Sequence, residues 1–401
     1  MNCTQLGYNL RSPMDPETNS VVHCLRAFLS SADVAPLRGV LIQTADWQGI
    51  EAKSAFHGVA PIVAKAFLQN ANDLAPEDVR QRSRNRLTLL AQKNILWLEV
   101  WQRLLQTFDE AAIPVISFKG PALALTAYSN LGLREFHDLD LLIHPRNVAR
   151  AKDKLLAAGY SLWSPVIGDT AESLLLSKNR QLRFTHPVRG ACVDLHWGLL
   201  HEMFSFQLDV EQTFNSARWE RYEEAEFLSL SPEYLLLYLC AHGTKSYWSN
   251  LSELCDVAAH IHSQSEIAWE GCIHLAEANG CELVLKHALL LCERVLRINL
   301  PEMVKQHCRQ DGKAIVLANA AESFLCLKGE IRPGYMRALK YYLDFAKTYR
   351  ERIRLIFVRV FAPGEPDWQH VQLPHRLFVF YYVIRPLRFL QEQKSKLMRS
   401  S

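Results

Sequence analysis

The sequence predicts an α+β fold in which a small mixed β-sheet core is flanked by N-terminal and C-terminal helical regions. Three observations predict it. Apolar residues recur with a helical period in the first part of the chain, short apolar runs bounded by turn residues fill the middle, and helical periodicity returns after Ser231. The expected division is an N-terminal helical region (1–110), an α/β core (111–228), a helical domain (229–361) and a C-terminal basic helical segment (362–401).

The core is expected to begin directly after a long helix, whose clearest stretch is 87–108 because its apolar residues keep a helical period. Residues 114–118 then predict a short strand, and Lys119-Gly120-Pro121 turns the chain into a short helix. Residues 139–143 predict a second strand, because they form an apolar run bounded by polar turns.

The second half of the core is expected to contain a helix and a hairpin. Residues 145–158 predict a helix that begins on proline and ends near a glycine. Residues 181–185 and 192–197 predict two strands that flank a His-Pro-Val-Arg-Gly turn. Ser231-Pro232-Glu233 is a helix start signal, and the further helices expected after it cover 250–263, 281–297 and 313–327. The expected linkers are Pro333-Gly334 and Pro363-Gly364-Glu365-Pro366.

The composition excludes several classes of protein. In 401 residues, 49% are apolar and 22% charged, which argues against disorder and coiled coil. With 45 basic and 42 acidic side chains the formal charge is +3, so any site for a polyanion has to be local. The ten cysteines form no C-x-x-C pair, and the longest apolar run near the C-terminus (377–384) is far shorter than the roughly twenty residues of a membrane span. Since no secretory signal begins the chain, we expect a cytoplasmic location and no transmembrane span.

The most informative segment contains two aspartates at the start of the 139–143 strand. Asp138 and Asp140 are two positions apart, so in a strand their carboxylates project to the same side. Adjacent like charges repel unless a cation lies between them, and Mg²⁺ prefers hard oxygen ligands of this kind. The alternative for an isolated D-x-D pair is a solvated turn.

Two further features favour the metal interpretation. Asp194 is a carboxylate inside an otherwise apolar strand, where its burial is costly without a counter-charge or a metal. Lys119-Gly120 lies between a strand and a helix, where backbone N–H groups favour a phosphate. Three carboxylates and a phosphate-binding turn are what two-metal phosphoryl transfer requires.

These motifs resemble a poorly characterised nucleotidyltransferase-fold family of the DNA polymerase β-like superfamily. The similar core elements are K-G-x-A-L on a helix start, a Tyr and an Arg before D-x-D-L-L-I, and V-D-L-H-W. The similar flanking elements are Trp47 with His57-Gly58-Val59-Ala60-Pro61, the series His242, Lys245, Trp248, Leu251 and Asp256, and Leu373-Pro374 with Tyr381-Tyr382 and Arg385-Pro386. The resemblance therefore spans most of the chain.

The resemblance implies transfer of a nucleoside monophosphate from ATP or another NTP to an acceptor hydroxyl, with Mg²⁺ or Mn²⁺ as cofactor and pyrophosphate as leaving group. It implies that Asp138 and Asp140 hold the metals and that Asp194 is the third carboxylate, nearest the acceptor. Gly120 would lie over the triphosphate, where the wider superfamily has a glycine-serine turn. Here Pro121 follows and removes one backbone donor, for which Lys119 offers a point charge.

Three further residues are candidates for nucleotide binding. Arg134 either reaches a phosphate or pins the turn before the 139–143 strand. His242 and Lys245 share one face near a helix end, where they either close over the nucleotide or form a surface pair that caps the helix. Trp248 either stacks on a base or belongs to the core, and the core is the favoured interpretation.

A zinc hydrolase site is the metal alternative, assembled from His137, His144 and His196. Their spacing matches no zinc motif, and three carboxylates favour a hard cation. The favoured interpretation of His196 is a strand residue whose ring bonds to a local partner.

A basic stripe lies at 331–360, where eight Lys or Arg accompany two acids and four tyrosines. It could contact nucleic acid or anionic lipid, but a solvated helix face is favoured, and the same holds for the basic tail 385–399. The leading hypothesis for the whole chain is a Mg-dependent nucleotidyltransferase that acts on a small molecule, peptide, protein or RNA. The alternatives are an inactive nucleotide-binding or scaffold protein of the same fold and a metal-dependent phosphodiesterase.

Overall fold

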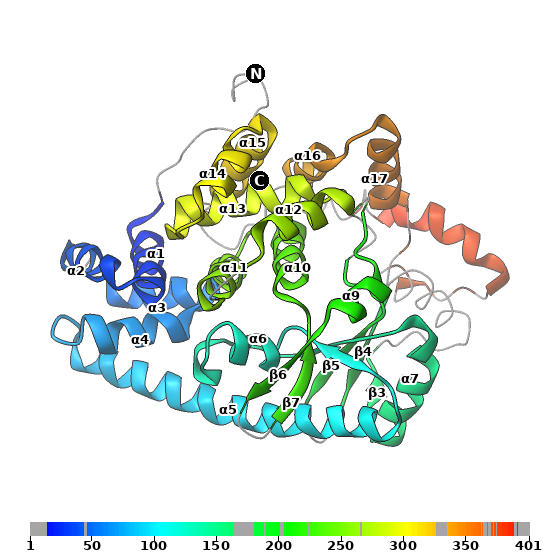
Figure 1. The fold of residues 1–401 in the computed structure, drawn as a ribbon, viewed down its shortest axis with the longest axis horizontal. Helices are drawn as coiled ribbons and strands as arrows, with labels where there is room; N and C mark the ends of the chain where they lie inside the picture. The colour runs from blue at the N-terminus through cyan, green and yellow to red at the C-terminus, as the bar shows by residue number, and fades with distance from the viewer. Residues whose placement is uncertain are drawn as a thin grey trace.

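A seven-stranded mixed sheet organises the structure, a computed structural model (Figure 1). The spatial order of its strands is β3-β4-β5-β2-β1-β7-β6, in which β2 and β5 pair in parallel, as do β1 and β7, and all other neighbours are antiparallel. The strands are β1 (Val115–Ser117), β2 (Leu139–Ile143), β3 (Ser161–Leu162), β4 (Gln181–Thr185), β5 (Cys192–His196), β6 (Arg218–Tyr222) and β7 (Ala225–Ser229).

The structure describes most, but not all, of the chain. The described residues are 14–43, 46–163, 180–187, 190–200, 204, 206–222, 225–264, 267–325, 335–361, 363, 367, 370, 371, 373, 375–388 and 391. The expectations for the start of the chain (1–13), the linkers at 333–334 and 364–366, and nearly all of the tail beyond 388 lie outside these residues.

The predicted fold class is confirmed, and so are the four predicted strands, which correspond to β1, β2, β4 and β5. The sequence analysis did not predict the β6–β7 hairpin or the two-residue β3. Charged residues dominate β6, where Arg218, Glu220 and Arg221 leave only two aromatic positions. Such a pattern is typical of a sheet edge, and it conceals a strand from a search for apolar alternation.

Helices before the sheet form the N-terminal region, and the longest of them supports the sheet. They are α1 (Pro16–Leu29), η2 (Ser31–Asp33), α2 (Val34–Gln43), α3 (Trp47–Phe56), α4 (Ala60–Asn70) and α5 (Glu77–Glu110). At 34 residues, α5 is about 50 Å long and runs along the base of the molecule beneath both the N-terminal helices and the strands (Figure 1). The predicted stretch 87–108 is its C-terminal two thirds.

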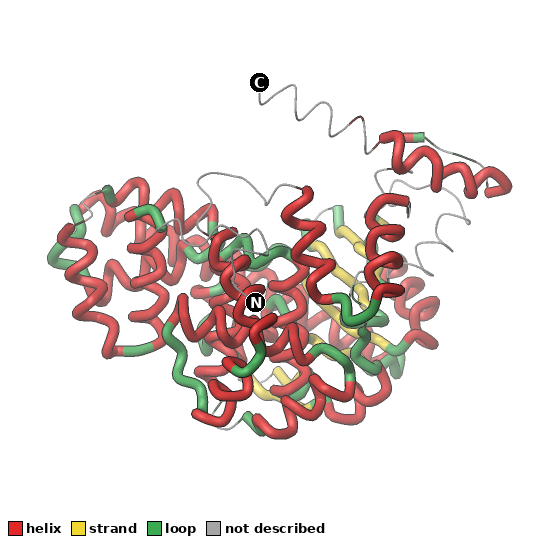
Figure 2. The backbone as a smooth tube through the Cα atoms, turned by 90° about the horizontal axis from the view of Figure 1, so that it is seen from above, coloured by secondary structure: helices red, strands yellow, loops and turns green. Residues whose placement is uncertain are grey.

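Short helices connect the strands of the core, and longer ones follow it. Within the core these are α6 (Pro121–Thr126), η3 (Leu131–Leu133), η4 (Pro145–Asn147), α7 (Val148–Ala157) and α9 (Val210–Ser216). After the core come α10 (Pro232–Lys245), α11 (Leu251–Ser263), α12 (Trp269–Ala278), α13 (Glu282–Leu296), α14 (Glu302–Arg309), α15 (Gly312–Leu325), α16 (Tyr335–Phe345), α17 (Tyr349–Phe361) and η5 (His375–Phe380). Viewed from above, helices surround the strands, and the C-terminal helix projects at one corner (Figure 2).

Two buried apolar clusters lie on the two faces of the sheet. On one face, Trp101 and Phe108 of α5 and Leu155 of α7 pack against strand residues such as Leu141 and Leu195. On the other face, a larger cluster joins the sheet to the N-terminal helices and to α10–α16. A polar side chain on this second face of the sheet therefore lies between the strands and α10.

Candidate active site

Two aspartates lie side by side on the central parallel strands. Asp140 on β2 and Asp194 on β5 are Cα partners in the register of the two strands. Their neighbours Leu139, Leu141 and Val193 belong to the cluster on the α5 side, so by alternation both carboxylates point toward α10. Each aspartate is almost completely buried, which confirms the expected burial of Asp194. A buried carboxylate costs free energy unless a counter-charge or a metal compensates it.

Arg183 on β4 supplies the counter-charge to these acids. It is the Cα partner of Asp194, to which its Nε and Nη2 atoms donate hydrogen bonds of 2.7 and 2.6 Å. The Nη2 atom also lies 3.1 Å from Oδ2 of Asp138, so one guanidinium bridges two of the three predicted acids. The Arg183 side chain is itself 41% exposed and faces the opening of the site.

The pKa values of the two members of the D-x-D pair shift in opposite directions. Burial and the adjacent carboxylates of Asp140 and Asp194 raise the pKa of Asp138. Burial also opposes the charge of Asp140, but the positive charge of Lys119 and the hydrogen bond to His196 outweigh it and hold the pKa of Asp140 below its ordinary value. That bond joins His196 Nε2 and Asp140 Oδ1 at 3.2 Å, which confirms a local partner for His196.

Basic side chains face the acids from across the site. The Nζ atom of Lys119, at the end of β1, lies 3.5 Å from Nε2 of His242 on α10. The charge of Lys119, burial and the charge of Lys245 together lower the pKa of His242 well below its ordinary value, so this ring is neutral. Burial and the charge of Lys119 also lower the pKa of Lys245.

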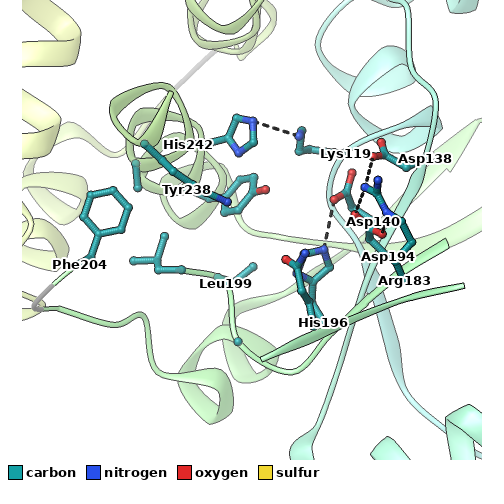
Figure 3. A pocket seen from close by; sticks show the side chains of 15 residues that line it. Lys119, Asp138, Asp140, Arg183, Asp194, His196, Leu199, Phe204, Tyr238 and His242 are labelled. Carbon is teal, nitrogen blue, oxygen red and sulfur yellow. Dashed lines mark hydrogen bonds and ion pairs between the residues drawn. The ribbon is translucent and has the colours of Figure 1, made fainter. Parts of the chain in front are cut away.

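These groups line one pocket of about 200 Å³ (Figure 3). The acids and Arg183 lie on one side, Tyr238 and His242 lie on the other, and Lys119 lies between them. The lining residues are Lys119, Asp138, Asp140, Gln181, Arg183, Asp194, His196, Gly198, Leu199, Leu200, Phe204, Tyr238, Ala241, His242 and Lys245. The structure therefore brings six of the eight predicted site residues into one cavity; Gly120 and Arg134 do not line it.

Gly120 holds the turn that leads into α6. Its φ of 56° is in the left-handed region, and a Cβ atom there would lie 3.0 Å from the carbonyl oxygen of Asp138. The turn thus packs against the backbone that carries the D-x-D pair. The helix that follows, α6, has only six residues and begins with Pro121, which has no N–H group to donate to a phosphate. Of the turn residues Lys119 and Gly120, Lys119 lines the pocket.

Arg134 forms a buried ion pair outside this pocket. Its Nε and Nη2 atoms donate to the two carboxylate oxygens of Asp256 on α11 at 2.8 and 2.9 Å, and Tyr128 donates to the same carboxylate at 2.7 Å. Arg134 lines a second cavity of about 240 Å³, which shares Lys119 and His242 with the first. This arrangement fits the interpretation that Arg134 pins the turn before β2.

The three histidines of the zinc alternative are not assembled. His137 lines the second cavity, and His144 stacks on Phe214 with ring centroids 3.9 Å apart. Among the described residues, the side chains at this site that are close enough together to hold one metal ion are those of Asp140, Asp194 and His196, whose potential ligand atoms lie within 4.8 Å of one another. Trp248 is fully buried and donates to His287, which confirms its assignment to the core.

The sequence analysis missed Arg183 and Glu253. The signal for Arg183 was present, because the predicted hairpin of 181–185 and 192–197 pairs residue 183 with residue 194 when counted outward from its turn. Glu253 on α11 lies 3.9 Å from His242 and accepts a hydrogen bond from Ser246. Because burial raises the pKa of Glu253 to about 8, it carries a proton at neutral pH, a state that its sequence context did not indicate.

A small mixed sheet carries paired carboxylates on adjacent central strands, and Lys119 and Lys245 line the same pocket. A family described as "uncharacterised nucleotidyltransferase" matches residues 43–297, well over half of the chain, and the chain belongs to this family. The search of curated proteins found no match to the chain. None of the helices in the described part of the chain has the length and apolar character needed to cross a membrane.

Proposed function

We propose that the protein is a Mg²⁺-dependent enzyme that transfers a nucleoside monophosphate from ATP or another NTP to an acceptor hydroxyl. The observation that carries this proposal is the pairing of Asp140 with Asp194 on adjacent parallel strands, with Asp138 at the rim of the same pocket. Membership of a nucleotidyltransferase family supports the reaction type.

The acidic side of the pocket fits a divalent cation. Asp140 Oδ2 is buried and has no hydrogen-bond partner among the described residues. Burial and the carboxylates of Asp140 and Asp194 raise the pKa of Asp138, and the charges of Lys119 and Arg183 only partly oppose this. In this proposal Asp138, Asp140 and Asp194 hold the metals, for which Mn²⁺ can replace Mg²⁺. When bound, the metals stabilise the charge on the attacking and leaving oxygens.

The basic side of the pocket suits the polyphosphate of an NTP. Lys119 carries a charge between the acids and α10, and Lys245 is a second cation of the same wall. Neutral His242 can donate or accept a hydrogen bond without adding charge. In this proposal these three residues orient the β- and γ-phosphates away from the carboxylates, so the α-phosphate lies next to Asp138 and Asp140.

The proposed reaction needs no other co-reactant. The acceptor oxygen forms a bond to the α-phosphorus, the bond from that phosphorus to the bridging oxygen breaks, and pyrophosphate leaves with the electron pair. The proton of the acceptor hydroxyl passes to the carboxylate of Asp194, the Cα partner of Asp140 on the neighbouring strand. Arg183 now occupies both oxygens of Asp194, so it has to release at least one of them when substrate binds.

The test is transfer of label from α-labelled NTPs. The purified protein is incubated with Mg²⁺ and each of four NTPs, alone and with a cell extract as the source of the acceptor. We expect pyrophosphate release and label on an extract component. Asp138→Ala with Asp140→Ala should lower the rate about a thousandfold or more, since metal ligation contributes several kcal/mol to transition-state stabilisation.

A matched control removes two acids elsewhere. Glu277 and Glu282 belong to a second cluster of metal-ligating type, with His307, away from the pocket. Glu277→Ala with Glu282→Ala should leave transfer unchanged. Mg²⁺-dependent NTP binding without pyrophosphate release would instead identify an inactive nucleotide-binding protein, and label released as free nucleoside monophosphate would identify a phosphodiesterase.

A further inference from the structure

The C-terminal helices carry an unusual share of exposed apolar surface. Among the described residues, half of the large apolar side chains that are exposed lie between 349 and 387. They are Tyr349, Ile353, Ile356, Phe357, Phe361, Leu377, Val379, Phe380, Val383 and Leu387. Isolated exposed apolar residues are normal, but a concentration of this kind marks an interaction surface.

On α17 these residues form one stripe. At 100° per residue, the five exposed apolar positions from Tyr349 to Phe361 fall within an arc of about 140°. Arg352 and Arg354, both exposed, lie just outside the two borders of that arc, and the exposed Arg350 lies within it beside Phe361. Ile353 is 53% exposed and Phe357 is 50% exposed, so the stripe faces solvent. This pattern reverses the usual orientation of a surface helix, whose apolar face packs on the core.

The opposite face of α17 is attached to the protein. Arg359 donates to the hydroxyl of Tyr247 at 2.6 Å, and its guanidinium lies 5.0 Å from the ring centroid of Tyr342. Tyr342 of α16, over which this guanidinium lies, is itself buried. The helix is therefore fixed with its apolar stripe outward, at the edge of the molecule next to the C-terminal helical segment (Figures 1 and 2).

The surface continues onto the segment at 375–388. Phe357 and Tyr382 stack with ring centroids 6.3 Å apart, which places the two segments side by side. Arg385 and Arg388 lie 3.7 and 2.6 Å from the buried carboxylate of Asp367. These two arginines therefore hold the segment in place, and we do not count them among the charges that attract a partner. Val383 and Leu387, one helical turn apart, remain exposed.

We propose that α17 and the exposed apolar residues of 377–387 dock on the surface of an anionic phospholipid membrane, with α17 lying in the plane of the interface. A helix with an exposed apolar face bordered by arginines has the composition of an interfacial helix. Four arginines against Glu351 give α17 a positive charge that complements anionic headgroups. A second copy would bring like charges together, and nucleic acid would leave Ile353 and Phe357 without apolar partners.

Within the described residues 335–360, exposed arginines such as Arg350 and Arg352 agree with the solvated helix face that the sequence analysis favours, and the proposal adds a role for the exposed apolar residues among them. In the structure it is Tyr341 and Tyr342 that are buried and Ile353 that is exposed. The proposal is independent of the reaction in the pocket, which lies on other elements.

The experiment is co-sedimentation of the full chain with lipid vesicles. Vesicles of phosphatidylglycerol mixed with phosphatidylcholine should bind the protein, vesicles of phosphatidylcholine alone should bind it at least about tenfold more weakly, and added salt should weaken the binding. Ile353→Glu with Phe357→Glu, and separately Arg352→Glu with Arg354→Glu, should each reduce binding about tenfold or more.

A control variant carries the same chemical change on another helix. Leu89 and Leu96 of α5 are 65% and 63% exposed, so Leu89→Glu with Leu96→Glu should bind vesicles like the wild type. Circular dichroism and thermal melts establish that each variant folds. Equal binding to both vesicle types, no binding, loss of binding in the α5 variant, or a wild-type dimer that Ile353→Glu with Phe357→Glu dissociates would each overturn the proposal.

Discussion

Two of the bidentate arginine–aspartate pairs among the described residues are alike in geometry and different in surroundings. Arg134 and Asp256 meet at 2.8 and 2.9 Å, and Arg183 and Asp194 meet at 2.7 and 2.6 Å. In the first pair each side chain is 10% exposed, whereas Arg183 is 41% exposed beside a nearly buried Asp194. The same contact geometry can therefore have two roles. We expect the buried pair of Arg134 and Asp256 to hold two parts of the fold together, and we expect the exposed Arg183 to balance the charge of Asp194 until a ligand replaces it.

The buried pair joins regions that are far apart in the sequence. Arg134 precedes β2 and Asp256 belongs to α11, while Tyr128 and Asn94 complete the network by donating to Asp256 and to the Arg134 carbonyl. Because burial removes both charges from water, the loss of one partner leaves the other uncompensated. The pair should therefore stabilise the position of the sheet relative to the helices.

The largest expected effect tests this clamp. Asp256→Ala should lower the free energy of unfolding by about 3–5 kcal/mol, since it strands the buried guanidinium of Arg134. Replacement of both residues by apolar ones, Arg134→Met with Asp256→Leu, should cost less than the single change. Urea denaturation followed by circular dichroism measures both variants.

An exposed pair of the same type provides the control. Arg38 and Asp73 are also bidentate, at 2.7 and 2.6 Å, and both are at least one third exposed. Asp73→Ala should lower the free energy of unfolding far less than Asp256→Ala, because water screens the charges of an exposed pair. If Asp256→Ala were no more destabilising than Asp73→Ala, the two pairs would not differ in the way that their burial indicates.

Local patterns were sufficient to predict the elements that form the site. Apolar runs bounded by turns predicted β2 and β5, and the common direction of Asp140 and Asp194 follows from the alternation of these strands. Asp138 lies directly before β2, so strand alternation does not determine the direction of its side chain. The hairpin register even places Arg183 beside Asp194. The assignment of catalytic roles to these residues stays a prediction.

Long-range partners could not be predicted in this way. The pairing of Arg134 with Asp256 spans 122 positions, and nothing local distinguishes an arginine that binds phosphate from one that clamps a helix. The parallel contact of β2 with β5 depends on how the chain crosses between them. The outward orientation of Ile353 and Phe357 depends on which face of α17 the rest of the protein covers.

Glu253 and Asp256 are two acids on α11 that differ in their partners. Asp256 forms an ion pair with Arg134, whereas Glu253 pairs with no arginine among the described residues and its pKa is raised by burial. Burial raises its pKa to about 8 from an ordinary value of 4.5. Between these values the unfolded chain has lost the proton that the folded protein keeps, so stability falls as pH rises and levels off above about 8. From pH 6 to pH 8 the wild type should lose roughly 2 kcal/mol more unfolding free energy than Glu253→Gln.

Urea denaturation at several pH values checks this prediction, and Glu110→Gln is the matched control. Glu110 is an exposed glutamate at the end of α5, so its replacement should leave the slope of stability against pH unchanged. A Glu253→Gln protein that keeps the wild-type slope would assign the pH dependence to another group and remove the contrast with Asp256.

The smallest expected effect concerns the pair of Arg183 and Asp194 in the pocket. Arg183→Ala removes the cation that now bridges Asp138 and Asp194, so their carboxylates should bind Mn²⁺ about tenfold more tightly in the absence of nucleotide. Since Arg183 is 41% exposed, stability should change by less than about 1 kcal/mol. Titration with Mn²⁺ followed by electron paramagnetic resonance measures the affinity.

Arg309→Ala separates this effect from a general change in charge. Arg309 pairs with Glu293 at 2.7 Å on helices α14 and α13, away from the pocket, and its loss should not alter Mn²⁺ affinity. A weaker affinity for Mn²⁺ in Arg183→Ala would mean that the guanidinium organises the acids rather than competes with the ion. Unfolding as severe as that of Asp256→Ala would make Arg183 a second clamp, and exposure would then not distinguish the two pairs.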